Sequence, residues 1–204
     1  MSSLATSILA GFKGRRSIYS LSNESPISDE RIEEILSEVI KNMPSGFNTQ
    51  GTRMVVLLKE EHQKLWDIAH EVASATVPAE QFETLYRNRI AGFRAGYGTV
   101  LFYEDPAVFK PLEAKMPMLI DKFPEWSDHA SGMSQLAVWT LLEAEGLGCS
   151  LQHYNPMIDA RVSEQWKVPK EWKSKSQLVF GKPNGPPREK TSQPLSSRLF
   201  VHGK

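Results

Sequence analysis

The feature that most constrains the fold is a long helical segment, residues 126–145, which is apolar nearly all the way round between Leu136 and Leu142. A helix on the surface of a protein needs only one apolar stripe, whereas a helix without a polar face must be covered on every side. In a chain of 204 residues, such a helix is either the centre of the core or part of a subunit interface. We expect it to serve as both.

Apolar residues at helical and strand spacing surround this segment. They predict further helices at residues 1–12, 28–43, 60–73, 79–93 and 156–168. They predict strands at residues 54–58, 97–103, 149–152 and 176–180, the first of them buried on both faces. Because helices and strands do not alternate strictly, we predict an α+β fold. A 40% apolar content supports one core, so we expect a single domain spanning residues 1–204.

The charge is balanced overall, with 24 basic and 24 acidic residues, so no bulk field attracts nucleic acid or an anionic membrane. The two ends of the chain differ from the rest. The first 19 residues include Lys13, Arg15 and Arg16 and no acid, while residues 182–204 contain five basic residues against the single acid Glu189. We therefore expect the two ends to share one anion.

The single cysteine, Cys149, cannot form an internal disulfide and favours a reducing compartment, which we take to be the cytoplasm. We expect it to be a small, buried packing residue. No apolar run approaches the ~20 residues that span a bilayer, and the N-terminus lacks the basic start of a signal peptide. The histidines show no metal-ligand spacing, so we predict no metal site.

Two segments have side chains suited to a ligand. Arg15, Arg16 and Ser17 follow a helix and could bind a phosphate, although arginines at a helix end more often face water or the helix carboxyl end. The loop at residues 44–53 has amides, hydroxyls and two glycines that suit the edge of a flat heterocycle. The alternative is a polar loop that satisfies its own backbone.

Four segments, in order and spacing, resemble the FMN-dependent nitroreductase family, and more narrowly its compact members from fungi and some bacteria. These segments are Arg15-Arg16-Ser17-Ile18-Tyr19, residues 44–50, Gly146-Leu147-Gly148-Cys149-Ser150, and Gly181-Lys182-Pro183 with Lys190 and Pro194-Leu195. The resemblance implies a central mixed sheet flanked by helices. It also implies a homodimer that holds FMN in two equivalent clefts, with the long helix at the interface and the C-terminal arm exchanged.

The same resemblance implies the FMN contacts. Residues that match the phosphate, ribityl and pyrimidine contacts are Arg15, Arg16 and Ser17. Tyr19 departs from the pattern, since it stands where relatives often have a basic residue near the polar end of the ring. Residues that match the loop from the partner subunit are Pro44, Ser45 and Asn48, and Gln50 matches the residue that follows this loop. Residues that match the segment near the reactive face are Ser150, Leu151, Gln152 and His153. Lys190 matches a phosphate-binding lysine, with Arg188 as a substitute for the arginine that relatives often have at Ser192. For His153, a role as a plain hydrogen-bonded strand-end histidine stays equally open.

The resemblance thus implies an FMN-dependent oxidoreductase that transfers electrons from NAD(P)H to nitroaromatics, quinones or similar flat acceptors by a ping-pong mechanism. The flavin itself carries the electrons, so we assign no catalytic residue. The chain departs from the family pattern at Gly46, Gly51 and Ser192. These departures leave a flavin-binding regulatory or oxidative-stress-response protein with little turnover as the alternative.

Overall fold

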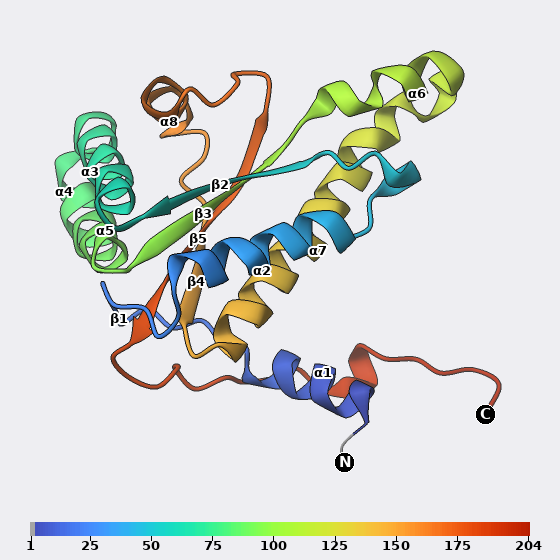
Figure 1. Cartoon of the computed structure of the whole chain (residues 1–204), viewed down its shortest axis with the longest axis horizontal. Helices are drawn as coiled ribbons and strands as arrows, with labels where there is room; N and C mark the ends of the chain where they lie inside the picture. The colour runs from blue at the N-terminus through green and yellow to red at the C-terminus, as the bar shows by residue number, and fades with distance from the viewer. Residues whose placement is uncertain (1–2) are drawn as a thin grey trace.

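The computed structural model describes residues 3–204, which form a five-stranded sheet with helices on both faces (Figure 1). The strands are β1 (Leu21–Ser22), β2 (Thr52–Leu58), β3 (Gly98–Glu104), β4 (Gly148–Gln152) and β5 (Lys173–Pro183). Their order is β1-β5-β3-β2, and β4 also pairs with β5. The strands pair antiparallel, and a parallel bridge joins Ser17 to Cys149. All four predicted strands are present, and β1 was not predicted.

The main helices are α1 (Leu4–Gly14), α2 (Asp29–Asn42), α3 (Lys59–Thr76), α5 (Arg87–Arg94), α7 (Phe123–Ala144) and α8 (Asp159–Trp166). Shorter pieces are η1 (Gly46–Asn48), α4 (Ala79–Gln81), the π-helical η2 (Phe82–Tyr86), η3 (Pro106–Phe109), α6 (Lys110–Lys115), η4 (Pro117–Lys122) and η5 (Leu195–Ser197). All six predicted helices are confirmed, with bounds that differ by a few residues, and α4, η2 and α5 together form one of them. The start of the first predicted helix, residues 1–2, lies outside the described residues.

The ends of α2 illustrate how local sequence sets a helix. The Ser28 hydroxyl accepts a hydrogen bond from the Arg31 backbone N–H at 3.2 Å, and Asp29 and Glu30 occupy the positive first turn. The helix ends at Asn42, just before Pro44, which cannot continue it.

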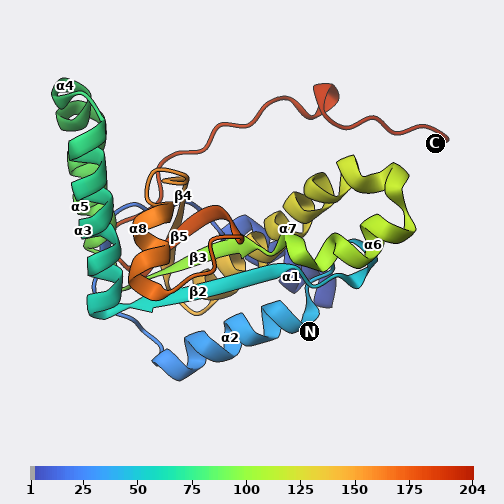
Figure 2. The same cartoon turned by 90° about the horizontal axis from the view of Figure 1, so that it is seen from above.

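Strand β3 lies at the centre of the sheet and separates two parts of the core. Val100 and Phe102 face the side covered by α2 and α7, while Leu101 and Tyr103 face the side covered by α3, α5 and α8. All seven residues of β3 are buried, because β2 and β5 flank it and helices cover both faces (Figure 2). The α+β prediction is therefore confirmed.

The prediction that residues 54–58 are buried on both faces is wrong. Strand β2 forms hydrogen bonds only with β3 among the described residues, so it is an edge strand, and within it only Leu57 is fully buried. Val56 is 37% exposed. A short valine-rich run has the same sequence pattern in a central strand as in a half-covered edge strand, so the pattern did not separate them.

The long helix α7 is covered by its own chain on one side only. Val138 and Leu142 are fully buried, whereas Met133, Leu136 and Leu141 are each 40–43% exposed. The prediction that this helix packs in the core is confirmed, and its place at a subunit interface stays a prediction. No helix within residues 3–204 combines the length and the apolarity needed to cross a bilayer.

Buried His62 on α3 should make stability depend on pH. Its side chain is fully buried, with Nδ1 2.8 Å from the Thr99 hydroxyl, and burial lowers its pKa from 6.5 to about 4. The unfolded chain therefore binds a proton that the folded protein excludes, and stability falls as the pH decreases from 6.5 towards 4, by about 3 kcal/mol in all. Urea unfolding across this range should show a smaller loss for His62→Gln than for the parent protein. The exposed-site control His129→Gln should keep the parent's dependence, and an unchanged dependence in His62→Gln would contradict this account.

Candidate functional site

The segment after α1 runs beside the first residues of β4. Ser17 forms the parallel bridge to Cys149, and the Ile18 N–H donates to the Cys149 carbonyl at 2.8 Å. Cys149 is fully buried, as predicted. The three residues Arg15, Arg16 and Ser17 are thus held by backbone pairing to the same strand that contains Ser150 and Gln152.

Glu143, near the end of α7, fixes this segment. Its carboxylate accepts a hydrogen bond from the Arg16 backbone N–H at 2.8 Å and another from the Trp139 indole N–H at 2.9 Å. Burial raises the pKa of Glu143, and these two hydrogen bonds oppose the rise. The Arg15 guanidinium lies 4.3 Å from the centre of the Trp139 ring and forms no ion pair with a described residue. Its positive charge lowers the pKa of Glu143, but its N–H groups form no hydrogen bond with a described residue and can bind an anion.

The C-terminal segment reaches the same place, as expected from the two basic ends. An Arg16 guanidinium N–H donates to the Arg188 carbonyl at 2.5 Å, and the Arg188 guanidinium lies 5.0 Å from the centre of the Tyr19 ring. In Figure 1 the C-terminal arm overlaps α1, and Figure 2 shows that the arm and the helix lie apart in depth. Arg188 and Lys190 are exposed and form no ion pair with a described residue. Basic groups from both ends thus gather within one region.

Strand β4 contributes two polar atoms without partners. The Ser150 hydroxyl oxygen and the Gln152 amide nitrogen are both buried, and neither forms a hydrogen bond within the described structure. A buried polar group without a partner costs about 1–3 kcal/mol, so such groups usually mark a missing ligand, ion or water. Leu151 packs against the core on the α7 side, and His153 is exposed.

The loop at residues 44–50 is held in a strained conformation. Phe47, Asn48 and Gln50 have φ of 54°, 54° and 52°, in the left-handed region that is sparse for residues other than glycine. The Ser45 hydroxyl accepts the Gln50 backbone N–H at 2.9 Å, so part of the loop does satisfy its own backbone. The side chains of Asn48 and Gln50 are exposed and make no hydrogen bond with a described residue. Strain of this kind often accompanies a binding role.

This loop and the arginine segment lie at opposite ends of α7. The Phe47 ring is 5.8 Å from the Trp126 ring on the first turns of the helix, whereas Arg15 packs on Trp139. At 1.5 Å per residue, the two tryptophans are separated by about 20 Å along the helix axis. One chain therefore brings the arginines, β4 and the C-terminal segment together but keeps the loop away from them.

The sequence analysis did not single out two buried or half-buried carboxylates. Glu143 lies beside the arginine segment, and Glu104, at the end of β3, lies near the loop. Glu104 is 3% exposed and accepts hydrogen bonds from the Thr52 hydroxyl at 2.7 Å and the Ser127 hydroxyl at 2.8 Å, which joins the chain after the loop to α7. Burial raises the pKa of Glu104. In the sequence, the only sign that Glu104 and Glu143 are buried is that each acid lies within or at the end of an apolar run.

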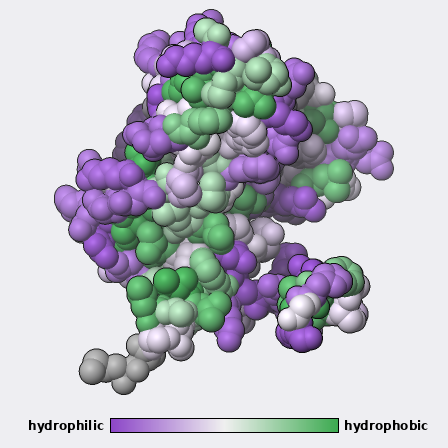
Figure 3. Space-filling view, turned by 90° about the vertical axis from the view of Figure 1, so that its right-hand side faces the viewer, coloured by the Kyte–Doolittle hydropathy of each residue, from purple (hydrophilic) through white to green (hydrophobic). Residues whose placement is uncertain are grey.

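Exposed apolar residues extend from this region over the surface. None of the described residues of α1 is buried, and large side chains of this helix and of the C-terminal arm are exposed. These residues are Leu4, Ile8, Leu9, Phe12, Leu195, Leu199, Phe200 and Val201. Figure 3 shows hydrophobic residues gathered on the lower part of one face, where α1 lies. No group of three or more potential metal ligands occurs within residues 3–204.

Comparison with known proteins gives consistent matches. A family model described as the nitroreductase family matches residues 12–182. The Saccharomyces cerevisiae protein HBN1 is 41% identical over 195 residues, covering 94% of this chain and 95% of that protein, and the nitroreductase FRM2 of the same yeast is 36% identical over 186 residues, covering 90% and 91%. The structure of the nitroreductase CinD from Lactococcus lactis, in complex with chloramphenicol, has a TM-score of 0.86 at 37% identity, and the match covers 96% of this chain and 100% of CinD. The predicted nitroreductase-like fold is confirmed.

Replacing Glu143 should loosen the attachment of the arginine segment. In the parent protein, the Arg16 and Trp139 N–H groups each donate to one carboxylate oxygen of Glu143. The amide of Glu143→Gln has only one acceptor oxygen, so one hydrogen bond is lost and the free energy of unfolding should fall by about 1–3 kcal/mol. Urea unfolding measures this loss. The control is Glu38→Gln, which changes an exposed acid paired with Lys41 and should lose clearly less, because an exposed ion pair contributes little to stability. Equal effects in the two variants would contradict the anchoring role of Glu143.

Proposed function

The chain belongs to the nitroreductase family, and from that premise we propose that it is an FMN-dependent oxidoreductase. It takes electrons from NAD(P)H and passes them to nitroaromatics, quinones or similar flat acceptors by a ping-pong mechanism. The observation that carries the proposal is the pair of unpartnered polar atoms on β4, Ser150 Oγ and Gln152 Nε2, together with Arg15 on the segment bridged to β4, which forms no ion pair with a described residue. We expect the enzyme to act in the cytoplasm.

The residues near β4 fit the chemical groups of FMN. The phosphate monoester suits the unpaired guanidinium of Arg15 and the neighbouring basic residues Arg188 and Lys190. Ser17, Ser150 and Gln152 suit the hydroxyls and the hydrogen-bonding edge of the heterocycle. FMN, when bound, accepts and releases the electrons. The protein's part is to hold the ring and to place donors such as Arg16 near its pyrimidine edge, where negative charge develops.

The acceptor specificity rests on relatives. The L. lactis nitroreductase CinD has been crystallised with chloramphenicol, nicotinic acid and 4-nitrophenol, which all have flat rings. A 17% identical structure from Desulfovibrio desulfuricans was solved in complex with FMN. A site in which one flat ring stacks on the flavin, leaves and is replaced by another can bind the electron donor NAD(P)H and the acceptor in turn.

A homodimer would complete the site. The two predicted halves lie about 20 Å apart along α7, and the face of α7 that includes Met133 and Leu136 is exposed. If the α7 helices of two copies cross antiparallel on a two-fold axis, the loop of one copy comes next to the arginines of the other. Ser45, Asn48 and Gln50 then contact the partner's FMN. The extended C-terminal arm would lie against the partner and cover apolar side chains there.

Bound flavin gives the direct test of this function. In a stopped-flow instrument, NADH or NADPH should bleach the visible absorption of the protein-bound flavin faster than that of free FMN. Reoxidation by a nitroaromatic or a quinone should restore the absorption. Protein that stays colourless after incubation with FMN would refute the proposal, and bound flavin that is reduced no faster than free FMN would favour the regulatory alternative.

Arg15→Ala should weaken FMN binding. Loss of one charge-assisted contact to the phosphate corresponds to about 1.5–3 kcal/mol, or roughly tenfold or more in Kd. Titration of the apoprotein with FMN, followed by flavin fluorescence, measures the affinity. Lys13→Ala is the matched control, since it removes an exposed charge two residues earlier. If both variants bind FMN like the parent protein, Arg15 does not contact the phosphate.

Removing the arm should weaken the dimer. Deletion of residues 191–204 removes four exposed apolar side chains, Leu195, Leu199, Phe200 and Val201, but keeps Lys190. Light scattering over a dilution series should show dissociation at a higher protein concentration than for the parent, because less apolar area is buried between the subunits. Deletion of Lys204 alone is the control. A truncated protein that dissociates at the parent's concentration would show that the arm does not hold the dimer together.

A further inference from the structure

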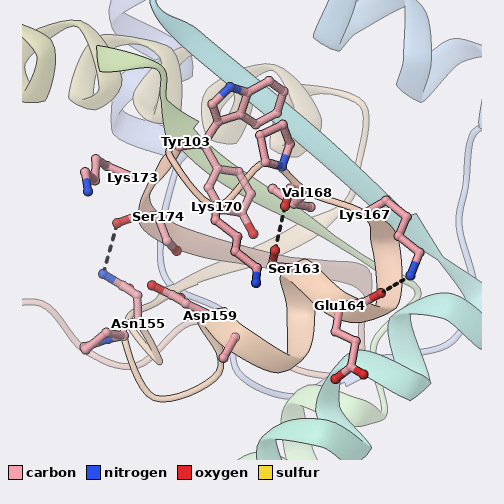
Figure 4. A pocket seen from close by; sticks show the side chains of 14 residues that line it. Tyr103, Asn155, Asp159, Ser163, Glu164, Lys167, Val168, Lys170, Lys173 and Ser174 are labelled. Carbon is pink, nitrogen blue, oxygen red and sulfur yellow. Dashed lines mark hydrogen bonds between the residues drawn. The ribbon is translucent and has the colours of Figure 1, made fainter. Parts of the chain in front are cut away.

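One hollow of the protein is lined by none of the predicted cofactor residues. It has a volume of about 890 Å³ and opens between α8 and the start of β5 (Figure 4). Its residue Tyr103 belongs to the part of the core that contains Val162 of α8, whereas the α7 residues Val138 and Leu142 belong to the other part. The hollow is thus on the face of the sheet opposite α7. The size falls within the range of small-molecule sites, about 300–1,000 Å³.

Tyr103 presents an unpartnered polar group to this hollow. The residue is 5% exposed, its hydroxyl makes no hydrogen bond with a described residue, and Figure 4 shows the hydroxyl pointing into the space. Burial and the nearby charge of Asp159 raise its pKa far above the ordinary value, so the hydroxyl stays neutral and can both donate and accept. The ring is buried while the hydroxyl faces the open hollow, so the hydroxyl is free to bond a ligand that enters.

Asp159 supplies an unpaired carboxyl group in the same space. It is half-buried at the start of α8 and forms no ion pair with a described residue. Burial raises its pKa, and the Ser174 hydroxyl opposes the rise. A cation that entered the hollow would favour the ionised carboxylate and gain a charge-assisted hydrogen bond.

The rest of the lining combines an aromatic and aliphatic wall with further charges of both signs, Glu164 and three lysines, and with polar side chains of asparagine and serine. The Trp172 ring lies 6.2 Å from the Tyr103 ring, and Val168 and Pro169 extend the apolar wall. Lys170 and Lys173 also line the hollow and form no ion pair with a described residue. A purely cationic ligand would be repelled by these lysines and a purely anionic one by Asp159, so the charges favour a molecule that has both signs.

We propose that this hollow binds a small aromatic zwitterion of the amino-acid type. The ammonium group pairs with Asp159, the carboxylate pairs with Lys170 or Lys173, and the ring packs against Trp172. Tyr103 donates a hydrogen bond to the carboxylate or to a polar ring atom. The site is independent of the FMN cleft, so it can be tested whether or not the oxidoreductase proposal holds.

Isothermal titration of the full-length protein as purified tests the proposal with three probes. These are L-tryptophan, indole-3-propionate, which lacks the ammonium group, and tryptamine, which lacks the carboxylate. We expect L-tryptophan to bind, and each analogue to bind about tenfold or more weakly because it loses a charged contact. Absence of L-tryptophan binding, or equal binding of either analogue, overturns the proposal.

Variants locate the binding. Asp159→Asn should weaken L-tryptophan binding about tenfold or more, and Tyr103→Phe, which keeps the buried ring, roughly two- to tenfold. The control Asp121→Asn changes an exposed carboxylate on η4, outside the lining, and should bind like the parent. Thermal unfolding of each variant confirms that it is folded. Binding that is unchanged in both Asp159→Asn and Tyr103→Phe would mean that the ligand sits elsewhere and would overturn the assignment.

Discussion

The carboxylate of Glu143 is the contact on which the rest of the candidate site depends. It accepts hydrogen bonds from the Arg16 backbone, 127 residues away in sequence, and from the Trp139 indole, on whose ring Arg15 packs. A half-buried acid is costly unless its charge is compensated, and here both donors and a nearby guanidinium provide the compensation. The N-terminal segment is thereby fixed to the end of α7, next to β4.

A single copy of the chain builds only part of the proposed flavin site. The arginine segment, β4 and the start of the C-terminal arm meet at one end of α7, while the strained loop with Asn48 packs on Trp126 near the other end. Large apolar side chains are exposed on α1, α7 and the arm, as expected of surfaces that another subunit covers. Both observations favour a two-fold assembly in which each copy supplies the half that the other lacks.

Much of the fold could be predicted because apolar periodicity is a local signal. The helix caps, the α+β class and the meeting of the two basic ends followed from Ser28, from the apolar spacing and from Arg15, Arg16 and the C-terminal charges. The edge position of β2 and the exposure of one side of α7 could not be predicted, since they depend on neighbours that the local pattern does not encode. The anchoring role of Glu143 was also hidden, because its partner Arg16 is distant in the chain. The two-residue strand β1 is too short to have a pattern.

The central claim is that each flavin site draws on two copies of the chain, and mixed dimers test it most directly. A chain with Arg15→Ala is co-expressed with a Ser45→Ala/Asn48→Ala chain, each with a different affinity tag, and the mixed species is purified through both tags. Each homodimer has two damaged sites, whereas the mixed dimer has one intact site and one with both defects. We predict one tightly bound FMN per mixed dimer and weak binding by both homodimers. Equal, weak binding at both sites of the mixed dimer, or parental affinity in the loop-variant homodimer, would contradict the account.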